Sequence, residues 1–297
     1  MKVGRHMMFT KRKLTLLGVI LIVAGVISCM TIPVGRGREG LCFVGVGCSP
    51  PLNPAQWGLV VVTHGWVEKS QGSWPEDMSV AICEHVDLKE WMCAYFDWSK
   101  GAQTINATTA AEYARDVAGP RLAREIISSC GHLRHIHMIG HSGGCWAISE
   151  AAKILARETK ADIHLTFLDA YIPMFWEEAS LGEVKTQHGV NYWADHYYTR
   201  DYTLGWTQHD LSFAHNVDVT EIDQHLKDHN FPWKWYHATV TGEYPKGYML
   251  DDLKLVTVAG GIEYGFARSH ERSRLNGWNK SLELPAGNEA VKLQKKN

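Results

Sequence analysis

The sequence has no excess of charge of either sign. Its 297 residues include 30 basic and 32 acidic side chains, for a formal net charge of −2. A protein that contacts nucleic acid through phosphates needs a surface rich in lysine and arginine, so this balance argues against a nucleic-acid partner. The chain also lacks an internal repeat of about 20 to 50 residues, the signature of repeat architectures.

Metal-binding cysteine spacing is absent as well. None of the seven cysteines lies in a C-x-x-C or Cys/His zinc motif, so the spacing predicts no zinc site, and we expect no metal or other cofactor. Cys83 and Cys93, on either side of "EHVDLKEWM", are our first choice for a disulfide in an oxidising compartment. Cys42 with Cys48 is the second.

No apolar run is long enough to span a bilayer comfortably. The run "LTLLGVILIVAGVIS" (14–28) falls short of the roughly 20 residues that a transmembrane helix needs. Five basic residues precede it and Cys29 follows it, which predicts an export segment over 1–29. "VISC" also resembles a bacterial lipobox, in which Cys29 would carry the lipid. A single-pass N-terminal anchor is the alternative, and both place the protein outside the cytoplasm, at a membrane of the periplasm or cell surface.

Apolar and helix-forming segments alternate from residue 57 onward, after a Pro- and Gly-containing linker over 30–56. Expected strands cover 59–66, 91–98, 136–139 and 162–171, and expected helices cover 77–90, 108–129 and the stretch to 158. This alternation predicts an α/β class domain over 57–287, with a mostly parallel central sheet flanked by helices. The aromatic-rich region 172–228 is either a cap or a set of loops packed on the core, and 288–297 is expected to be a polar tail.

The stretch "HMIGHSGG" (137–144) has the order strand, sharp turn, helix. In a G-x-S-x-G elbow the glycines allow strand and helix to pack closely, while the serine projects from strained backbone. Ser142 is therefore the candidate nucleophile, and a plain serine in a glycine-rich turn is the alternative. A serine hydroxyl needs a base, and the base needs an orienting carboxylate.

Chain order then suggests the partners of Ser142. Asp169 ends the strand after the elbow helix, in "FLDAY", and is the expected acid; Asp195 and Asp223 are fallbacks. His229, in the polar loop before Pro232, is the expected base. The other candidate histidines are His188, His196, His209, His215, His225, His237 and His270. The oxyanion hole needs two backbone N–H donors, for which Gly143 and Trp66 are the candidates.

Several ordered motifs between about 57 and 173 resemble the pancreatic-lipase-like branch of the α/β-hydrolase family. They are "THGW", "FDWSKGA", "ARDVAGPRLAREI", "IHMIGHSGG" and "FLDAY". The resemblance implies an α/β-hydrolase fold with Ser142 as nucleophile, Asp169 as acid, and Trp66 and Gly143 in the oxyanion hole. His229 before "WKWY" is similar to the family's histidine before a tyrosine-containing helix, and a disulfide near Cys83 and Cys93 is similar too. The chain departs from the family in having Gly143 where leucine is usual and "LDAY" in place of "LDP".

These observations predict an exported serine hydrolase that cleaves small-molecule or lipid carboxylic esters through a Ser-His-Asp triad and an acyl-enzyme. An amidase, a thioesterase or a phospholipase would carry the same triad. A binding module that keeps the fold without catalysis is the alternative from another class.

Overall fold

The computed structural model describes residues 39–45, 55–69, 72–174, 176, 180–200, 206–222, 228–242, 257–258, 262–269, 271 and 291–293. All of them belong to one compact unit, Arg38–Asn297. The predicted export segment 1–29, with Cys29, lies outside the described residues. Among the helices that are described, none has the length and apolar character needed to cross a membrane.

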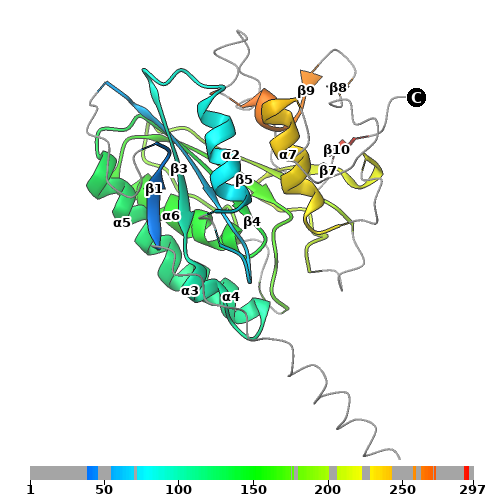
Figure 1. Cartoon of the computed structure of the whole chain (residues 1–297). Coiled ribbons are helices and arrows are strands. Elements are labelled where there is room, and N and C mark those ends of the chain that lie inside the picture. Colours follow the sequence, from blue (N-terminus) through cyan, green and yellow to red (C-terminus); the bar gives the residue numbers. More distant parts are fainter. Residues whose placement is uncertain are drawn as a thin grey trace, which may run out of the picture. The chain divides into compact units, whose positions relative to one another are not determined.

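The described residues form an eight-stranded sheet with the order β1-β3-β2-β4-β5-β6-β7-β10 (Figure 1). The strands are β1 (Gly40–Phe43), β2 (Gly58–Thr63), β3 (Trp91–Asp97), β4 (His135–His141), β5 (Asp162–Leu168), β6 (Tyr192–Tyr198), β7 (His215–Asp218) and β10 (Val291–Lys292). β1 is antiparallel to β3, and the other neighbouring strands are parallel. β8 (Thr257–Val258) and β9 (Ile262–Glu263) form a separate antiparallel pair.

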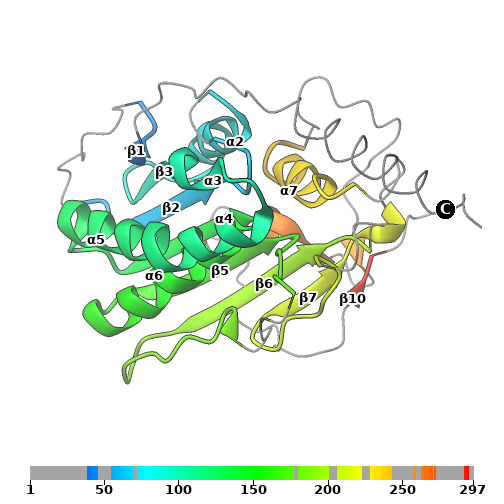
Figure 2. The same ribbon diagram turned by 90° about the horizontal axis from the view of Figure 1, so that it is seen from below.

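Helices cover both faces of the sheet, so the predicted α/β class is confirmed (Figures 1 and 2). One face carries α3 (Ser99–Ala102), α4 (Ala107–Tyr113), the π-helical turn η1 (Ala114–Ala118), α5 (Gly119–Cys130) and α6 (Gly144–Glu158). The other carries α2 (Trp74–Cys83) and α7 (Phe231–Thr241), with the 3-10 turn η4 (Gly265–Arg268) beside α7. A further 3-10 turn, η3, spans Thr220–Ile222.

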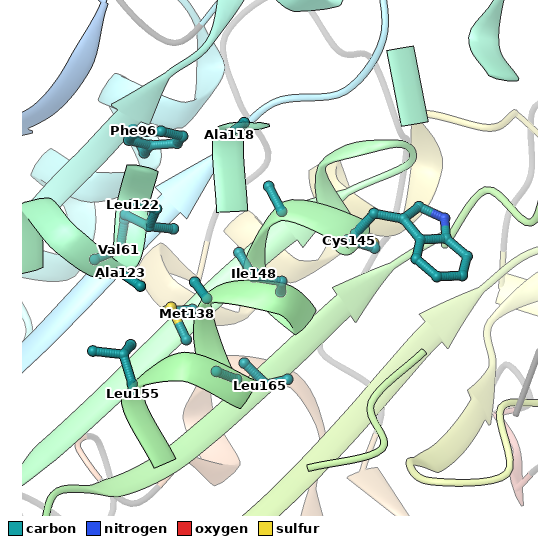
Figure 3. Close-up of a cluster of buried hydrophobic side chains, with 14 of the residues drawn as sticks. Val61, Phe96, Ala118, Leu122, Ala123, Met138, Cys145, Ile148, Leu155 and Leu165 are labelled. Carbon is teal, nitrogen blue, oxygen red and sulfur yellow. The ribbon is translucent and has the colours of Figure 1, made fainter. Parts of the chain in front are cut away.

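The face under α5 and α6 is packed almost entirely with apolar side chains. Figure 3 shows Met138 and Leu165 of the sheet beneath Leu122, Ile148 and Leu155 of the two helices, all fully buried. The helix expected over 108–129 forms as the continuous series α4, η1 and α5. α5 and α6 lie so close that a Cβ on the first residue of α5, a glycine, would stand 2.7 Å from the carbonyl oxygen of Ala147.

Three predicted boundaries are wrong. The stretch 30–56, expected as a linker, contributes β1, and the expected tail contributes β10. The region 172–228, expected as a cap or loops, contributes the parallel strands β6 and β7. β6 has the sequence "YWADHYY" and is buried on both faces, so it lacks the hydrophobic alternation by which a half-exposed strand is recognised.

Cys83 and Cys93 are free thiols, in contrast to the predicted bridge. They nevertheless lie in contact. The Cys83 thiol forms a hydrogen bond with Cys93, and this bond lowers the pKa of Cys83. Burial raises the pKa of Cys93. Cys48, of the second proposed pair, lies outside the described residues.

Candidate active site

Ser142 occupies the sharp turn between β4 and α6. Its φ of 52° is unusual for a residue with a side chain and marks local backbone strain. The turn is held by hydrogen bonds from the Ser142 N–H to Leu168 O, 3.0 Å, and from the Cys145 N–H to Ser142 O, 3.1 Å. A Cβ at Gly144 would lie 2.1 Å from the carbonyl oxygen of His64, so glycine is required there. A Cβ at Gly143 would meet nothing closer than 3.9 Å.

Asp169 and His229 are brought together beside this turn. β4 and β5 are parallel neighbours with His141 opposite Leu168, so Ser142 and Asp169, which follow these two residues, leave the same edge of the sheet. The Asp169 carboxylate is fully buried and accepts the Thr199 N–H at 2.8 Å and His229 Nδ1 at 2.5 Å. This bond places a proton on Nδ1, which leaves Nε2 of the neutral ring as the basic nitrogen.

The loop after β2 lies directly against the elbow. A Cβ on Gly65 would stand 2.8 Å from that of Ser142, so the glycine permits this approach. His64 is stacked on Trp98 and buried, and burial lowers its pKa. The Trp98 N–H donates to His64 Nε2 at 3.1 Å, while Nδ1 donates to Gly65 O at 2.9 Å. This neutral tautomer therefore fixes the shape of the loop that carries Trp66.

The backbone N–H groups on either side of Trp66 are already engaged. Gly65 donates to Glu68 Oε2 at 2.8 Å, and Val67, at a φ of 61°, donates to Ala102 O at 3.0 Å. The Trp66 ring is fixed by its own Nε1–H, which donates to Thr104 O at 3.0 Å. Trp66 is thus held in the turn after β2 by the bonds of its two neighbours and of its own ring.

Two residues that the sequence analysis did not assign, Glu68 and His141, support this arrangement. His141 Nε2 lies 3.1 Å from the carbonyl oxygen of His229, and its Nδ1 lies 3.3 Å from Glu68 Oε2. Burial by itself would raise the pKa of Glu68, but the charge of His141 and hydrogen bonds from His141 and Gly65 lower it to about 2. The only sequence signal was the position of these residues inside "THGWVE" and "GHSGG", next to assigned ones.

Comparison with known proteins gives a partial match. Over 120 residues the chain is 29% identical to pancreatic lipase-related protein 2 of Homo sapiens. The aligned stretch covers 39% of this chain and 24% of that protein. The chain thus spans only about a quarter of the length of this relative. No protein-family model matches.

Two solved structures are also similar, at low identity. Est1E from Butyrivibrio proteoclasticus is 16% identical, with a TM-score of 0.36 over 68% of this chain and 90% of that one. A lipase-esterase related protein from Clostridium acetobutylicum ATCC 824 is 11% identical, with a TM-score of 0.33 over 58% and 85%.

The strand order, with one antiparallel edge strand, and the elbow at the end of a central strand identify the fold. The chain has an α/β-hydrolase fold. Within this fold the fallback acid Asp195 lies inside the sheet, bonded to His164, Thr166 and Tyr197, away from Asp169 and His229. Asp223, His225 and His270 lie outside the described residues.

The remaining candidate histidines occupy other parts of the α/β-hydrolase fold. His196 is buried in β6 and bonded to Asn216, and burial lowers its pKa to about 4. His237 lies on α7, where burial lowers its pKa, and His215 begins β7, stacked with Tyr264. His188 and His209 are exposed.

Aromatic side chains contact the elbow or its neighbours, and exposed apolar side chains follow in the chain. The Tyr171 N–H donates to Ser142 O at 3.3 Å, and the Tyr171 ring contacts Trp206 edge to face. Ile105, next to the residue that anchors the Trp66 ring, is 90% exposed, and Met174, three residues after Tyr171, is 56% exposed. These two exposed apolar side chains thus belong to segments next to residues that contact the Trp66 ring and the Ser142 backbone.

Proposed function

We propose that this α/β hydrolase is a serine esterase that acts on carboxylic esters with an apolar acyl group. The observation that carries the proposal is the Asp169–His229 hydrogen bond at the same sheet edge as the strained Ser142. The partial match to a pancreatic lipase relative and the apolar residues around the elbow support an ester with hydrocarbon character.

In the proposed reaction, His229 Nε2 takes the proton of the Ser142 hydroxyl as Oγ attacks the ester carbonyl carbon. The N–H groups of Trp66 and Gly143 stabilise the negative oxygen of the tetrahedral intermediate. His229 then gives the proton to the leaving alkoxide, which departs as the alcohol. A water molecule, deprotonated by His229, attacks the acyl-enzyme, and the proton returns to Ser142 Oγ as the carboxylic acid is released.

Replacement of the nucleophile tests the chemistry. Ser142→Ala is expected to lower ester turnover by at least about 10³-fold and to abolish labelling by a fluorophosphonate, with an unchanged thermal midpoint. Ser128→Ala, at an exposed serine on α5, is the matched control and should keep full labelling. Labelling of the Ser142→Ala protein at the wild-type level would contradict the proposal.

The identity of the base is tested by replacing two histidines of the same segment separately. His229→Ala should cost about 10³-fold or more in kcat, whereas His237→Ala, on α7 and remote from Asp169, should cost little.

A series of p-nitrophenyl esters of increasing acyl length, with a matched amide, tests the substrate class. Faster cleavage of the amide than of any ester would favour an amidase.

We propose, in addition, that the chain is exported and held at a membrane by lipid on Cys29. The basic residues before the apolar run 14–28 and the cysteine after it support this location. Intact-mass analysis of the membrane fraction is the test: a lipidated chain beginning at Cys29 is expected. A chain that still begins at Met1 would favour an uncleaved anchor.

A further inference from the structure

A second group of polar side chains is buried on the face of the sheet beneath α2 and α7. Alternate residues of a strand point to the same face, so His135 and His137 of β4 share a side. The parallel register places His137 beside His164 and Thr166 beside Asp195. We call the group the His-Glu cluster; it comprises His135, His137, His164, Thr166, Asp195 and Glu271, none more than 3% exposed.

Glu271 is the centre of the His-Glu cluster. Its carboxylate is fully buried, with Oε1 2.7 Å from His135 Nε2 and Oε2 3.2 Å from His137 Nδ1 and 3.9 Å from His164 Nδ1. Among the described residues, Oε1 has no hydrogen-bond partner of suitable geometry, although His135 is so near. A buried carboxylate needs a cation or hydrogen-bond donors, and His137 Nδ1 forms a hydrogen bond to Oε2, while nitrogens of His135 and His164 also face the carboxylate.

The hydrogen bonds of Asp195 determine which nitrogen of His164 carries the proton. The Asp195 carboxylate accepts the Thr166 hydroxyl at 2.7 Å and approaches His164 Nε2 to 3.0 Å. A carboxylate has no proton to donate, so the proton lies on Nε2. The other nitrogen, Nδ1, then presents a lone pair toward Glu271, and it has no hydrogen-bond partner within the described residues.

We propose that His135 Nε2, His164 Nδ1 and the Glu271 carboxylate bind a first-row divalent metal ion, for which Zn²⁺ is the probe. The three ligand atoms lie within 4.8 Å of one another. Two imidazoles and one carboxylate are a ligand set that Zn²⁺ accepts at about 2.0–2.2 Å, with a fourth position for water. The Asp195–His164 bond supplies the carboxylate that commonly orients a metal-bound histidine.

The position of the site indicates a structural role. His135 begins β4 and Ser142 follows the end of that strand, seven residues later, which is about 23 Å at roughly 3.3 Å per residue. A metal ion here would not reach the ester. It would join β4 and β5 to Glu271, which comes from a distant part of the chain, and binding of this kind adds directly to folding stability.

The alternative is a metal-free cluster in which protonated histidines balance Glu271. The two cases differ in the metal content of the purified full-length protein. We expect protein purified without chelator to contain one Zn²⁺ per chain, and we expect EDTA to lower the thermal midpoint and one equivalent of Zn²⁺ to restore it. Absence of stoichiometric metal together with a midpoint insensitive to EDTA and Zn²⁺ would overturn the proposal.

Substitutions of the proposed ligand residues test which side chains bind the metal ion. Glu271→Gln and His164→Gln should each weaken Zn²⁺ affinity at least about 10-fold, measured by competition with a chromogenic chelator. His137→Gln is the matched control, because His137 contacts the same carboxylate but does not belong to the ligand set. Unchanged affinity in Glu271→Gln, or loss of binding only in His137→Gln, would overturn the assignment.

A spectroscopic measurement on the unmutated chain covers the case in which the variants do not fold. Co²⁺ in this site should show d–d bands without a thiolate charge-transfer band, because no sulfur is among the ligands. A strong thiolate band would place the metal on cysteine and overturn the proposal. Metal content is independent of ester turnover, so the Ser142→Ala protein should bind Zn²⁺ like the wild type, even if the proposed hydrolase activity is wrong.

Discussion

The two faces of the central sheet differ in what holds them together. Under α5 and α6 the contact side chains are apolar, and glycines and alanines bring the backbones close. Under α2 and α7 the same strands present His137, His164 and Asp195, which are buried but joined by hydrogen bonds and ion pairs. One face therefore depends on close packing alone and the other on packing together with polar partners, and His229 of the candidate site belongs to this second, polar face.

The largest expected effect is on close packing, at the junction of α6 with the loop after β2. Gly144→Ala would place a methyl group 2.1 Å from His64 O, so backbone must move. We expect a loss of at least about 3 kcal/mol in the free energy of unfolding and a lower kcat, because the loop that carries Trp66 is displaced. Gly143→Ala, with its nearest contact at 3.9 Å, is the control for urea denaturation and should stay near wild type.

On the polar face, an isosteric change should be nearly as costly. Asp195→Asn replaces an acceptor of hydrogen bonds from Thr166 and Tyr197 by a group that also carries donors, and removes the charge beside His164. We expect a loss of about 2–3 kcal/mol in urea denaturation. Asp162→Asn, at the half-buried start of β5, keeps the oxygen that accepts the Asn191 N–H and should change stability by less than about 0.5 kcal/mol. Equal effects of the two changes would remove the distinction between the faces.

Neighbouring residues of β5 give the most direct comparison. Thr166→Val keeps the side-chain shape but removes the hydroxyl that bonds Asp195 and His137, at an expected cost of about 1–2 kcal/mol. Leu165→Met keeps the volume on the opposite face and should cost under about 1 kcal/mol. A larger loss for Leu165→Met would show that packing, not polar satisfaction, limits both faces.

The narrowest expected effect, confined to acidic pH, is a pH dependence at the edge of the polar face. The pKa of Glu68, about 2 in the folded protein against an ordinary value of 4.5, means that the ionised group stabilises the fold above pH 4.5. That contribution is lost as the pH falls from 4.5 through about 2. The thermal midpoint of the wild type should therefore approach that of Glu68→Gln over this range. A constant difference between the two midpoints across this interval would contradict it.

The sequence by itself was sufficient for features that depend on local backbone geometry. The G-x-S-x-G turn requires glycine where strand and helix meet, and the alternation of apolar and helix-forming segments between 57 and 173 determines a parallel sheet. The α/β class, the strand before Ser142 and the strand before Asp169 were predicted on these grounds, and the structure has them. The catalytic roles of these residues stay predictions.

Only the tertiary structure decided which distant residues meet. β6 and β7 were predicted as cap or loops, because burial on both faces removes alternation, and their polar residues are tolerated only through partners on other strands. His135, His164 and Glu271 are separated in the chain and follow no spacing rule, so no motif search could join them. His229 was the expected base among several candidate histidines, but only the fold places its Nδ1 2.5 Å from the Asp169 carboxylate, since hydrogen-bond distance depends on three-dimensional position and not on order along the chain.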